Sequence, residues 1–325
     1  MERRGLLKLA GTAAFARLLA GCERFVVLEP RLDPELSPVT PIGDFYRYQC
    51  CGYPELDVAT HTTAIAHEGT ELARFDLAFL ESLPSREREA TLQCIGSSPL
   101  VQRIGNAVWT GLPLVEVLAA LGVEVPDEAV GVRIDSVDGY DAGLPREVFD
   151  AMWLVWGMNG EALPPEHGAP ARLLVPGRYG VKNLKWLSAI TFVDEPHVSF
   201  WTQERNGAWD EEAVYRPNAL VAHPLSGAPV EEGPVRFIGT AFAGQDPVAS
   251  VEVSVDDGPW QEAAIEYAPG AGVWALWSAQ IELSAGEHTV QVRCTTESGA
   301  RSEPDPFGTD PKAGYDGSML VTVFV

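Results

Sequence analysis

The chain has 325 residues, with 46 acidic against 23 basic side chains and a formal net charge of −23. This length accommodates about two domains of ordinary size, and 46% hydrophobic residues with 9 Trp indicate a globular protein, not a disordered one. The acidity excludes nucleic acid as a partner, because phosphate binding needs Lys and Arg to displace counterions. It also disfavours an anionic membrane surface. Five cysteines are too few for a disulfide-built fold.

Residues 1–22 resemble an export leader. The pair Arg3-Arg4 resembles a twin-arginine signal, and the apolar stretch Leu9–Ala20 is too short to span a bilayer, which takes about 20 residues. It ends in a small-residue segment before Cys22, similar to a bacterial lipobox, so we expect Cys22 to become lipidated. An ordinary basic N-terminus is the alternative. The sequence thus predicts a protein exported to the periplasm or the outer face of the membrane, with a lipid anchor at Cys22.

The next two segments differ in pattern. Residues 23–43 contain four prolines and few periodic apolar positions, which predicts an extended tether. Residues 44–215 contain apolar patterns typical of helices and others typical of strands, which predicts an α+β domain. Its expected elements are helices over Leu114–Leu121 and Glu147–Trp156 and strands over Val130–Ile134 and Arg172–Val175.

Residues 216–325 have the sequence pattern of an all-β domain. Residues 231–234 mark the point at which the pattern changes. Short apolar runs recur with turn residues between them, and Asp257-Gly258 is typical of a hairpin turn. The spacing predicts an immunoglobulin-like β-sandwich of about 100 residues. The expected strands are Val235–Phe242, Val248–Val255, Trp274–Leu283, His288–Thr295 and Met319–Val325.

Two motifs carry the chemical prediction. Cys94 lies in Leu92-Gln93-Cys94-Ile95-Gly96, and a lone cysteine of this kind is most often a small buried hydrophobe. Downstream, however, residues 167–177 read HGAPARLLVPG and are followed by Lys185-Trp186. In this order and spacing, the two motifs resemble the sulfite oxidase family of molybdopterin-dependent oxidoreductases, over nearly the whole chain after the leader.

The resemblance implies a molybdenum–molybdopterin cofactor and assigns residues to it. Cys94 falls on the molybdenum ligand, for which a soft thiolate is suitable, and Arg47 falls beside the metal and an oxyanion substrate. The phosphate of the cofactor calls for Arg, Lys and N–H donors. The residues implied to contact the cofactor are Phe45, Tyr46, Arg47, Tyr48, Gln49, Asp138, His167, Arg172, Asn183, Leu184 and Lys185.

The substrate pocket departs from the family pattern. Ser97-Ser98-Pro99 stand where sulfite oxidases have Asn-Arg-Arg after the cysteine motif. Asn206 replaces a pocket Tyr, and a further pocket Arg is matched at best by Lys312. Fixed cationic groups recognise small dianions, so their loss weakens the case for sulfite itself. The resemblance implies oxygen-atom transfer at sulfite or another sulfur compound.

Partners and alternatives follow from the same comparison. No CxxCH haem motif is present, so electrons are expected to leave to an external carrier such as cytochrome c, for which an acidic surface is suitable. The family resemblance implies a homodimer through the C-terminal domain. Two other functions stay open: a sulfoxide-type reductase, and a non-catalytic exported lipoprotein that uses the fold as a binding module.

Overall fold

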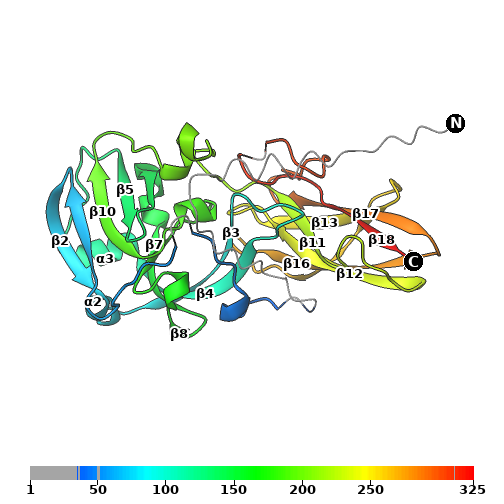
Figure 1. Cartoon of the computed structure of the whole chain (residues 1–325), viewed down its shortest axis with the longest axis horizontal. Coiled ribbons are helices and arrows are strands. Elements are labelled where there is room, and N and C mark those ends of the chain that lie inside the picture. Colours follow the sequence, from blue (N-terminus) through cyan, green and yellow to red (C-terminus); the bar gives the residue numbers. More distant parts are fainter. Residues whose placement is uncertain (1–34, 36, 50–51, 311) are drawn as a thin grey trace.

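A computed structural model describes residues 35, 37–49, 52–310 and 312–325. The leader, most of the tether and Cys22 therefore lie outside the described residues. The described chain is elongated, with an N-terminal region of two sheets beside a C-terminal sandwich (Figure 1). None of the described helices is long and apolar enough to cross a membrane.

The N-terminal region consists mostly of β-structure. One sheet has the order β2-β1-β10-β5-β6, with β1 parallel to β10, and the other runs β3-β4-β7-β8, with β9 paired to β7. Their strands are β1 (Thr62–His67), β2 (Thr70–Asp76), β3 (Arg86–Gln93), β4 (Ile104–Pro113), β5 (Gly131–Ser136), β6 (Asp141–Pro145), β7 (Trp153–Met158), β8 (Glu161–Ala162), β9 (Arg172–Leu174) and β10 (Leu187–Val193). The predicted strands over Val130–Ile134 and Arg172–Val175 are therefore present.

Helices are few and short among the described residues. The α-helices are α2 (Leu77–Glu81) and α3 (Leu114–Ala120), so the helix predicted over Leu114–Leu121 is confirmed. The 3-10 turns are η1 (Ile42–Asp44), η2 (Arg146–Ala151), η3 (Pro165–His167), η4 (Gly180–Lys182), η5 (Phe200–Thr202) and η6 (Glu204–Asn206). The α+β prediction thus gave this region too much helix.

The helix predicted over Glu147–Trp156 is wrong. The first part of this segment is the 3-10 turn η2, and its second part begins strand β7. Every residue of β7 after Trp153 is buried, because the strand lies inside its sheet. A strand covered on both faces has a continuous apolar run, and such a run has no period that separates it from a buried helix.

The C-terminal region is a sandwich of two four-stranded sheets. Their orders are β11-β12-β16-β15 and β14-β13-β17-β18. The strands are β11 (Asn218–His223), β12 (Gly233–Phe242), β13 (Val248–Val255), β14 (Gln261–Glu262), β15 (Ala264–Tyr267), β16 (Ala275–Leu283), β17 (Glu287–Thr296) and β18 (Leu320–Phe324). All five strands predicted here are present, and Cys294 is a buried core residue, as expected. The turn after β13 is centred on Asp256 and Asp257, both at positive φ, one residue before the predicted Asp257-Gly258.

Hydrogen bonds and apolar packing join the two regions. The side-chain amides of Gln93, at the end of β3, and Asn218, in β11, exchange two hydrogen bonds of 3.0 and 3.1 Å. The Tyr215 hydroxyl accepts a hydrogen bond from the backbone N–H of Gln93, and the sandwich core also includes Ile95 and Ile104. Contacts with the C-terminal region therefore fix the end of β3, which Cys94 directly follows.

Candidate active site

A cavity of about 410 Å³ brings the sequence-predicted residues together. They come from the segment after η1, the loops after β3 and β5, the turns around η3 and η4, the loop around η6, and the segment before β18. The predicted residues that line it are Phe45, Tyr46, Tyr48, Gln49, Cys94, Asp138, His167, Arg172, Asn183, Leu184, Lys185, Asn206 and Lys312. Arg47 is the one predicted site residue that is not among the lining residues.

Cys94 is a free, buried thiol at one end of the cavity. Its backbone N–H donates to the carbonyl of Arg103 at 2.9 Å, which closes the loop between β3 and β4. Burial raises the pKa of the Cys94 thiol, while the charge and a hydrogen bond of the Arg103 side chain act in the opposite direction. The thiol therefore lies beside a cation that favours its anionic form.

Arg172 is the most deeply buried cation of the cavity, with 5% of its surface exposed. Its two terminal nitrogens donate to the carbonyls of His167 and Asn183, both at 3.1 Å, so it ties two walls of the cavity together. The guanidinium lies 4.9 Å from the ring centre of Trp109. Burial lowers its pKa to about 10, and its Nε has no partner among the described residues.

Lys185 lies beside Arg172 and has weak neutral partners. Its Nζ is 3.2 Å from the carbonyl of Glu166 and 3.4 Å from Oε1 of Gln49, and 4.0 Å from the ring centre of Trp186. Burial, together with the positive charge of Arg172, lowers its pKa to about 7. Two buried cations with a carboxylate only at Asp138 among the cavity residues form a site that favours a bound anion.

His167 enters the site as a neutral group. Burial lowers its pKa to about 4, and its Nε2 lies 3.0 Å from the carbonyl of Ile42. Because a carbonyl only accepts hydrogen bonds, Nε2 carries the proton and Nδ1 is left as an acceptor. His167 is therefore suited to accept a hydrogen bond from an N–H group.

Asn183 shapes the cavity without free donors of its own. Its Oδ1 accepts from the backbone N–H of Val175 at 2.7 Å, and its Nδ2 donates to the carbonyls of Arg178 and Tyr179. The next residue, Leu184, belongs to the apolar core below the cavity. Asn183 and Leu184 thus stabilise the cavity wall around η4 through hydrogen bonds and apolar packing.

The aromatic segment after η1 covers the same end. Phe45 is buried, stacks on Tyr46 with ring centres 5.4 Å apart, and meets His167 edge-on at 5.6 Å. On the other side, Asp138 accepts a hydrogen bond from the N–H of Tyr140, and burial raises the pKa of its carboxyl group. The cavity end at Arg172 is therefore lined by rings, amides and buried cations.

Sequence reasoning missed Arg103, and it placed Arg47 elsewhere. Arg103 lines the cavity next to Cys94, and its guanidinium lies 5.0 Å from the ring centre of Tyr48. Arg47 instead donates to the carbonyl of Gly43 at 3.2 Å and lies 3.7 Å from the Glu166 carboxylate. A role for Arg47 beside the metal remains a prediction. Arg103 had no sequence signal, because its contact with the thiol depends on closure of the loop.

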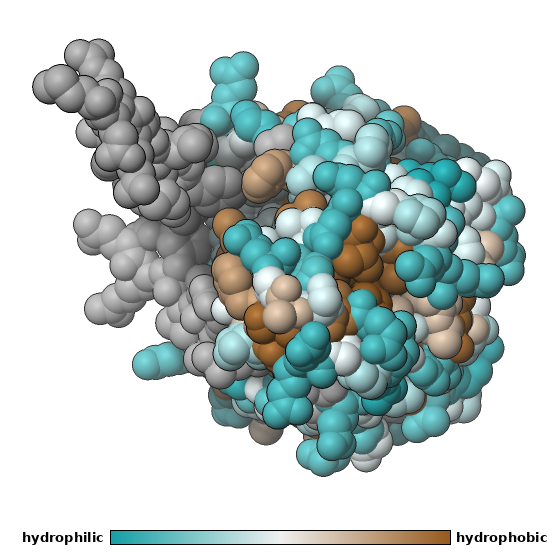
Figure 2. Space-filling model, turned by 90° about the vertical axis from the view of Figure 1, so that its right-hand side faces the viewer, coloured by the Kyte–Doolittle hydropathy of each residue, from teal (hydrophilic) through white to brown (hydrophobic). Residues whose placement is uncertain are grey.

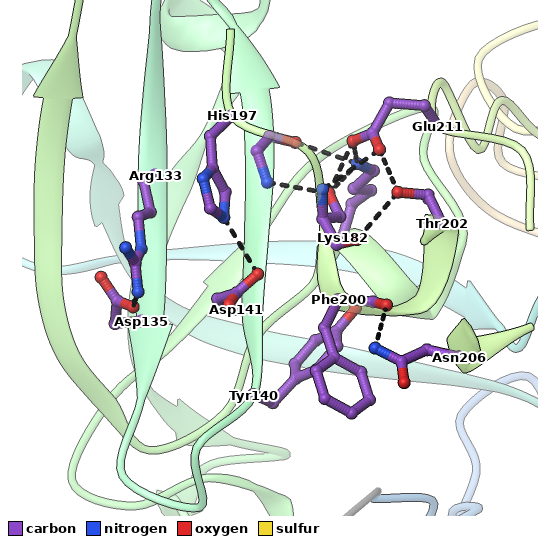
Figure 3. A network of polar contacts seen from close by, with 12 residues as sticks. Arg133, Asp135, Tyr140, Asp141, Lys182, His197, Phe200, Thr202, Asn206 and Glu211 are labelled. Carbon is purple, nitrogen blue, oxygen red and sulfur yellow. Dashed lines mark hydrogen bonds and ion pairs between the residues drawn. The ribbon is translucent and has the colours of Figure 1, made fainter. Parts of the chain in front are cut away.

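Asn206 belongs to a loop that buried polar contacts hold in place (Figure 3). Its Nδ2 donates to the carbonyl of Phe200 at 2.9 Å. Below this loop, Nζ of Lys182 contacts Glu211 at 2.5 Å and Ser199 at 2.6 Å. The amide of Asn206 thus braces the loop. Lys312, the other predicted pocket residue, is exposed at the edge of the cavity.

Comparisons with known proteins define the class. Residues 51–201 match the family model described as "Oxidoreductase molybdopterin binding domain". Mitochondrial sulfite oxidase of Homo sapiens is 28% identical over 84% of this chain and 59% of its own length. Sulfite oxidase of Arabidopsis thaliana is 26% identical over 87% of this chain and 86% of its own.

A solved structure has the same fold. The sulfane dehydrogenase SoxCD from Paracoccus pantotrophus matches with a TM-score of 0.76 and 22% identity, covering 88% of this chain and 84% of that one. Residues 51–201 thus match a molybdopterin-binding domain of oxidoreductases. The chain is similar to sulfite oxidases over most of its length and has the fold of the sulfane dehydrogenase. It spans about 59% of the length of the mitochondrial sulfite oxidases that it matches.

The residues of the cavity fit the cofactor of this family. Four of its lining side chains carry buried polar atoms with no partner among the described residues: Gln49 Nε2, Arg103 Nε, Ser136 Oγ and Arg172 Nε. Buried polar atoms normally have partners, so these mark surface that a polar ligand would satisfy. With the Cys94 thiol and the cations Arg172 and Lys185 lining one cavity, the side chains suit a metal bound to an anionic organic group.

Proposed function

We propose that this protein is a molybdenum-cofactor oxidoreductase that transfers an oxygen atom at a small sulfur compound, in the manner of sulfite oxidase, and passes the electrons to an external acceptor. One observation carries the proposal: a free buried thiol, Cys94, and four unpartnered buried polar groups face a single cavity. The similarity to sulfite oxidases supports the reaction class.

The residues divide the work in this proposal. When bound, the molybdenum cofactor supplies a two-electron oxidation coupled to oxygen-atom transfer. Cys94 would hold the metal through its sulfur, and Arg172 with Lys185 would bind the negative charge of the pterin phosphate. His167 Nδ1 is placed to accept an N–H of the pterin. Burial of these groups excludes water from the cofactor and strengthens each electrostatic contact.

The acceptor, assembly and location are part of the proposal. We infer an external carrier such as cytochrome c, since acidic residues outnumber basic ones two to one and a basic partner would be attracted. A homodimer through an immunoglobulin-like C-terminal domain is supported by an apolar band on the sandwich end of the molecule (Figure 2). Around β18, Leu225, Leu320 and Phe324 are exposed apolar residues. Export and a lipid anchor at Cys22 complete the proposal.

The test begins with metal content. The full chain, expressed in a host that makes the cofactor, is expected to contain one molybdenum per chain by elemental analysis. A steady-state screen with sulfite, thiosulfate and sulfoxides and a dye acceptor then identifies the reaction. If the purified protein contains no molybdenum, the proposal that it is a molybdenum enzyme fails, and a non-catalytic binding module is favoured instead.

A pair of cysteine variants tests the metal ligand. Cys94→Ser is expected to lose at least about 100-fold in kcat and to change the electron paramagnetic resonance signal of the metal, because a hydroxyl is a poor soft ligand. Cys294→Ser is the matched control, since Cys294 is equally buried but lies in the sandwich core. Full activity in Cys94→Ser would refute the ligand assignment even if metal is present.

A further inference from the structure

Beside Cys94, the cavity is lined by a half-buried arginine, Arg103. The loop from Cys94 to Arg103 is closed by the backbone hydrogen bond between its ends and by the Ser97 hydroxyl, which accepts from the Arg103 N–H at 3.1 Å. The guanidinium lies over the ring of Tyr48 and beside the Cys94 thiol. Its Nε is buried without a partner among the described residues. Arg103 is therefore fixed by the backbone and retains donor capacity.

Two indole rings form the wall beside this cation. Trp201 and Trp209 both line the cavity, and the backbone N–H of Trp209 donates to the carbonyl of Trp201 at 3.1 Å. A Cβ at Gly96 would lie 3.5 Å from the Trp209 ring, and a Cβ at Gly207 would lie 2.9 Å from it. The ring is thus packed between two glycines, and one of these is two residues from Cys94.

The charge balance of this end limits the substrate. Among the described side chains of this part of the cavity, Arg103 provides a half-buried positive charge, Lys312 is exposed at the edge, and the amide nitrogen of Asn206 is bound to Phe200. A sulfite dianion carries two charges and has no apolar group to pack on the indole rings. A neutral sulfoxide could pack on these rings, but it would form no charge-assisted hydrogen bond between ions with Arg103.

We propose that the substrate is an organic sulfinate, whose single negative charge binds Arg103 and whose apolar substituent packs on Trp201 and Trp209. This inference rests on the proposed function and names its substrate class. The balanced reaction is R–SO2⁻ + H2O → R–SO3⁻ + 2 H⁺ + 2 e⁻. A new S–O bond forms at the sulfur lone pair, water supplies the oxygen and the two protons, and two equivalents of a one-electron acceptor of the cytochrome c class take the electrons.

The first experiment compares substrates on the molybdenum-loaded full chain with a dye acceptor. We expect kcat/KM to fall from benzenesulfinate to methanesulfinate by at least about tenfold, since burying a ring contributes more than 1.4 kcal/mol. Sulfite is expected to be slower than both. Mass spectrometry should identify benzenesulfonate as the product, with one oxygen from labelled water.

A second experiment measures binding without turnover. In titration calorimetry with benzenesulfonate, Arg103→Met is expected to weaken binding at least tenfold, and Arg103→Lys to restore part of it. Trp209→Leu should weaken benzenesulfonate binding and leave methanesulfonate binding nearly unchanged. Arg236→Met is the control, because Arg236 is an exposed arginine on β12 outside the cavity. Circular dichroism checks that each variant is folded.

The outcomes separate this inference from the proposed function. Oxidation of sulfite but not of either sulfinate would overturn the sulfinate assignment and leave the proposed function standing. Equal benzenesulfonate binding by the native chain and Arg103→Met would also overturn it. If the loaded protein oxidises no sulfur compound and reduces no sulfoxide, the proposed function fails and this inference fails with it.

Discussion

The two ends of the cavity are built differently. At the Arg172 end, the cation, His167 and Asn183 are buried and bound to backbone carbonyls or amides of neighbouring turns. At the other end, indoles and Asn206 are carried on a loop of 3-10 turns, and Arg103 is a half-buried cation with a buried, unpartnered Nε among the described residues. The first end suits a large cofactor with fixed chemistry. The second can change with the substrate while the first is retained.

The largest expected effect comes from removing the central cation. Arg172→Met leaves the carbonyls of His167 and Asn183 without this donor and removes the charge that we propose binds the cofactor phosphate. We expect molybdenum content to fall more than tenfold and the free energy of unfolding to fall by about 3 kcal/mol. Elemental analysis and urea unfolding measure both. Arg133→Met, an exposed arginine on β5, is the control; normal metal content in Arg172→Met would contradict the assignment of this end.

A smaller effect should be confined to the substrate end. Lys182 is buried and holds the loop through Ser199 and Glu211 (Figure 3). Lys182→Met is expected to lower the free energy of unfolding by about 2 kcal/mol, since Glu211 retains access to water. KM should rise while molybdenum content and kcat change little. Loss of metal in this variant would show that the two ends are coupled and would contradict the view that one can change while the other is retained.

The third prediction concerns the pH dependence of stability. The pKa of Lys185 is lowered to about 7 in the folded chain by burial and by Arg172, whereas it is about 10.4 when exposed. Between these values the unfolded chain binds more protons, so the cofactor-free protein should become more stable as pH rises from 7 to 10. Urea midpoints measure this trend. The cofactor-loaded protein and Lys185→Met should both show a weaker rise, because a bound phosphate raises this pKa and Met does not titrate.

How much the sequence predicted depends on how local each signal is. The motif around His167 and the strands of the sandwich are local patterns, and the structure brings the motif to the cavity. Strand β7 was taken for a helix because a doubly buried strand has no amphipathic period. Arg103 was missed because its position beside the thiol follows from loop closure, nine residues after Cys94, and residue type alone does not encode that contact.

The amide pair between Gln93 and Asn218 has a consequence for biosynthesis. Asn218 is 125 residues further along the chain than Gln93, so it leaves the ribosome long after the Cys94 loop has been made. Until β11 has emerged and docked, the end of β3 lacks the partner that fixes it, and the thiol cannot be held in its final position. We therefore expect cofactor insertion to follow completion of both regions. A chain truncated before residue 218 should fail to retain molybdenum, even with every residue proposed to contact the cofactor, from Phe45 to Lys185, present.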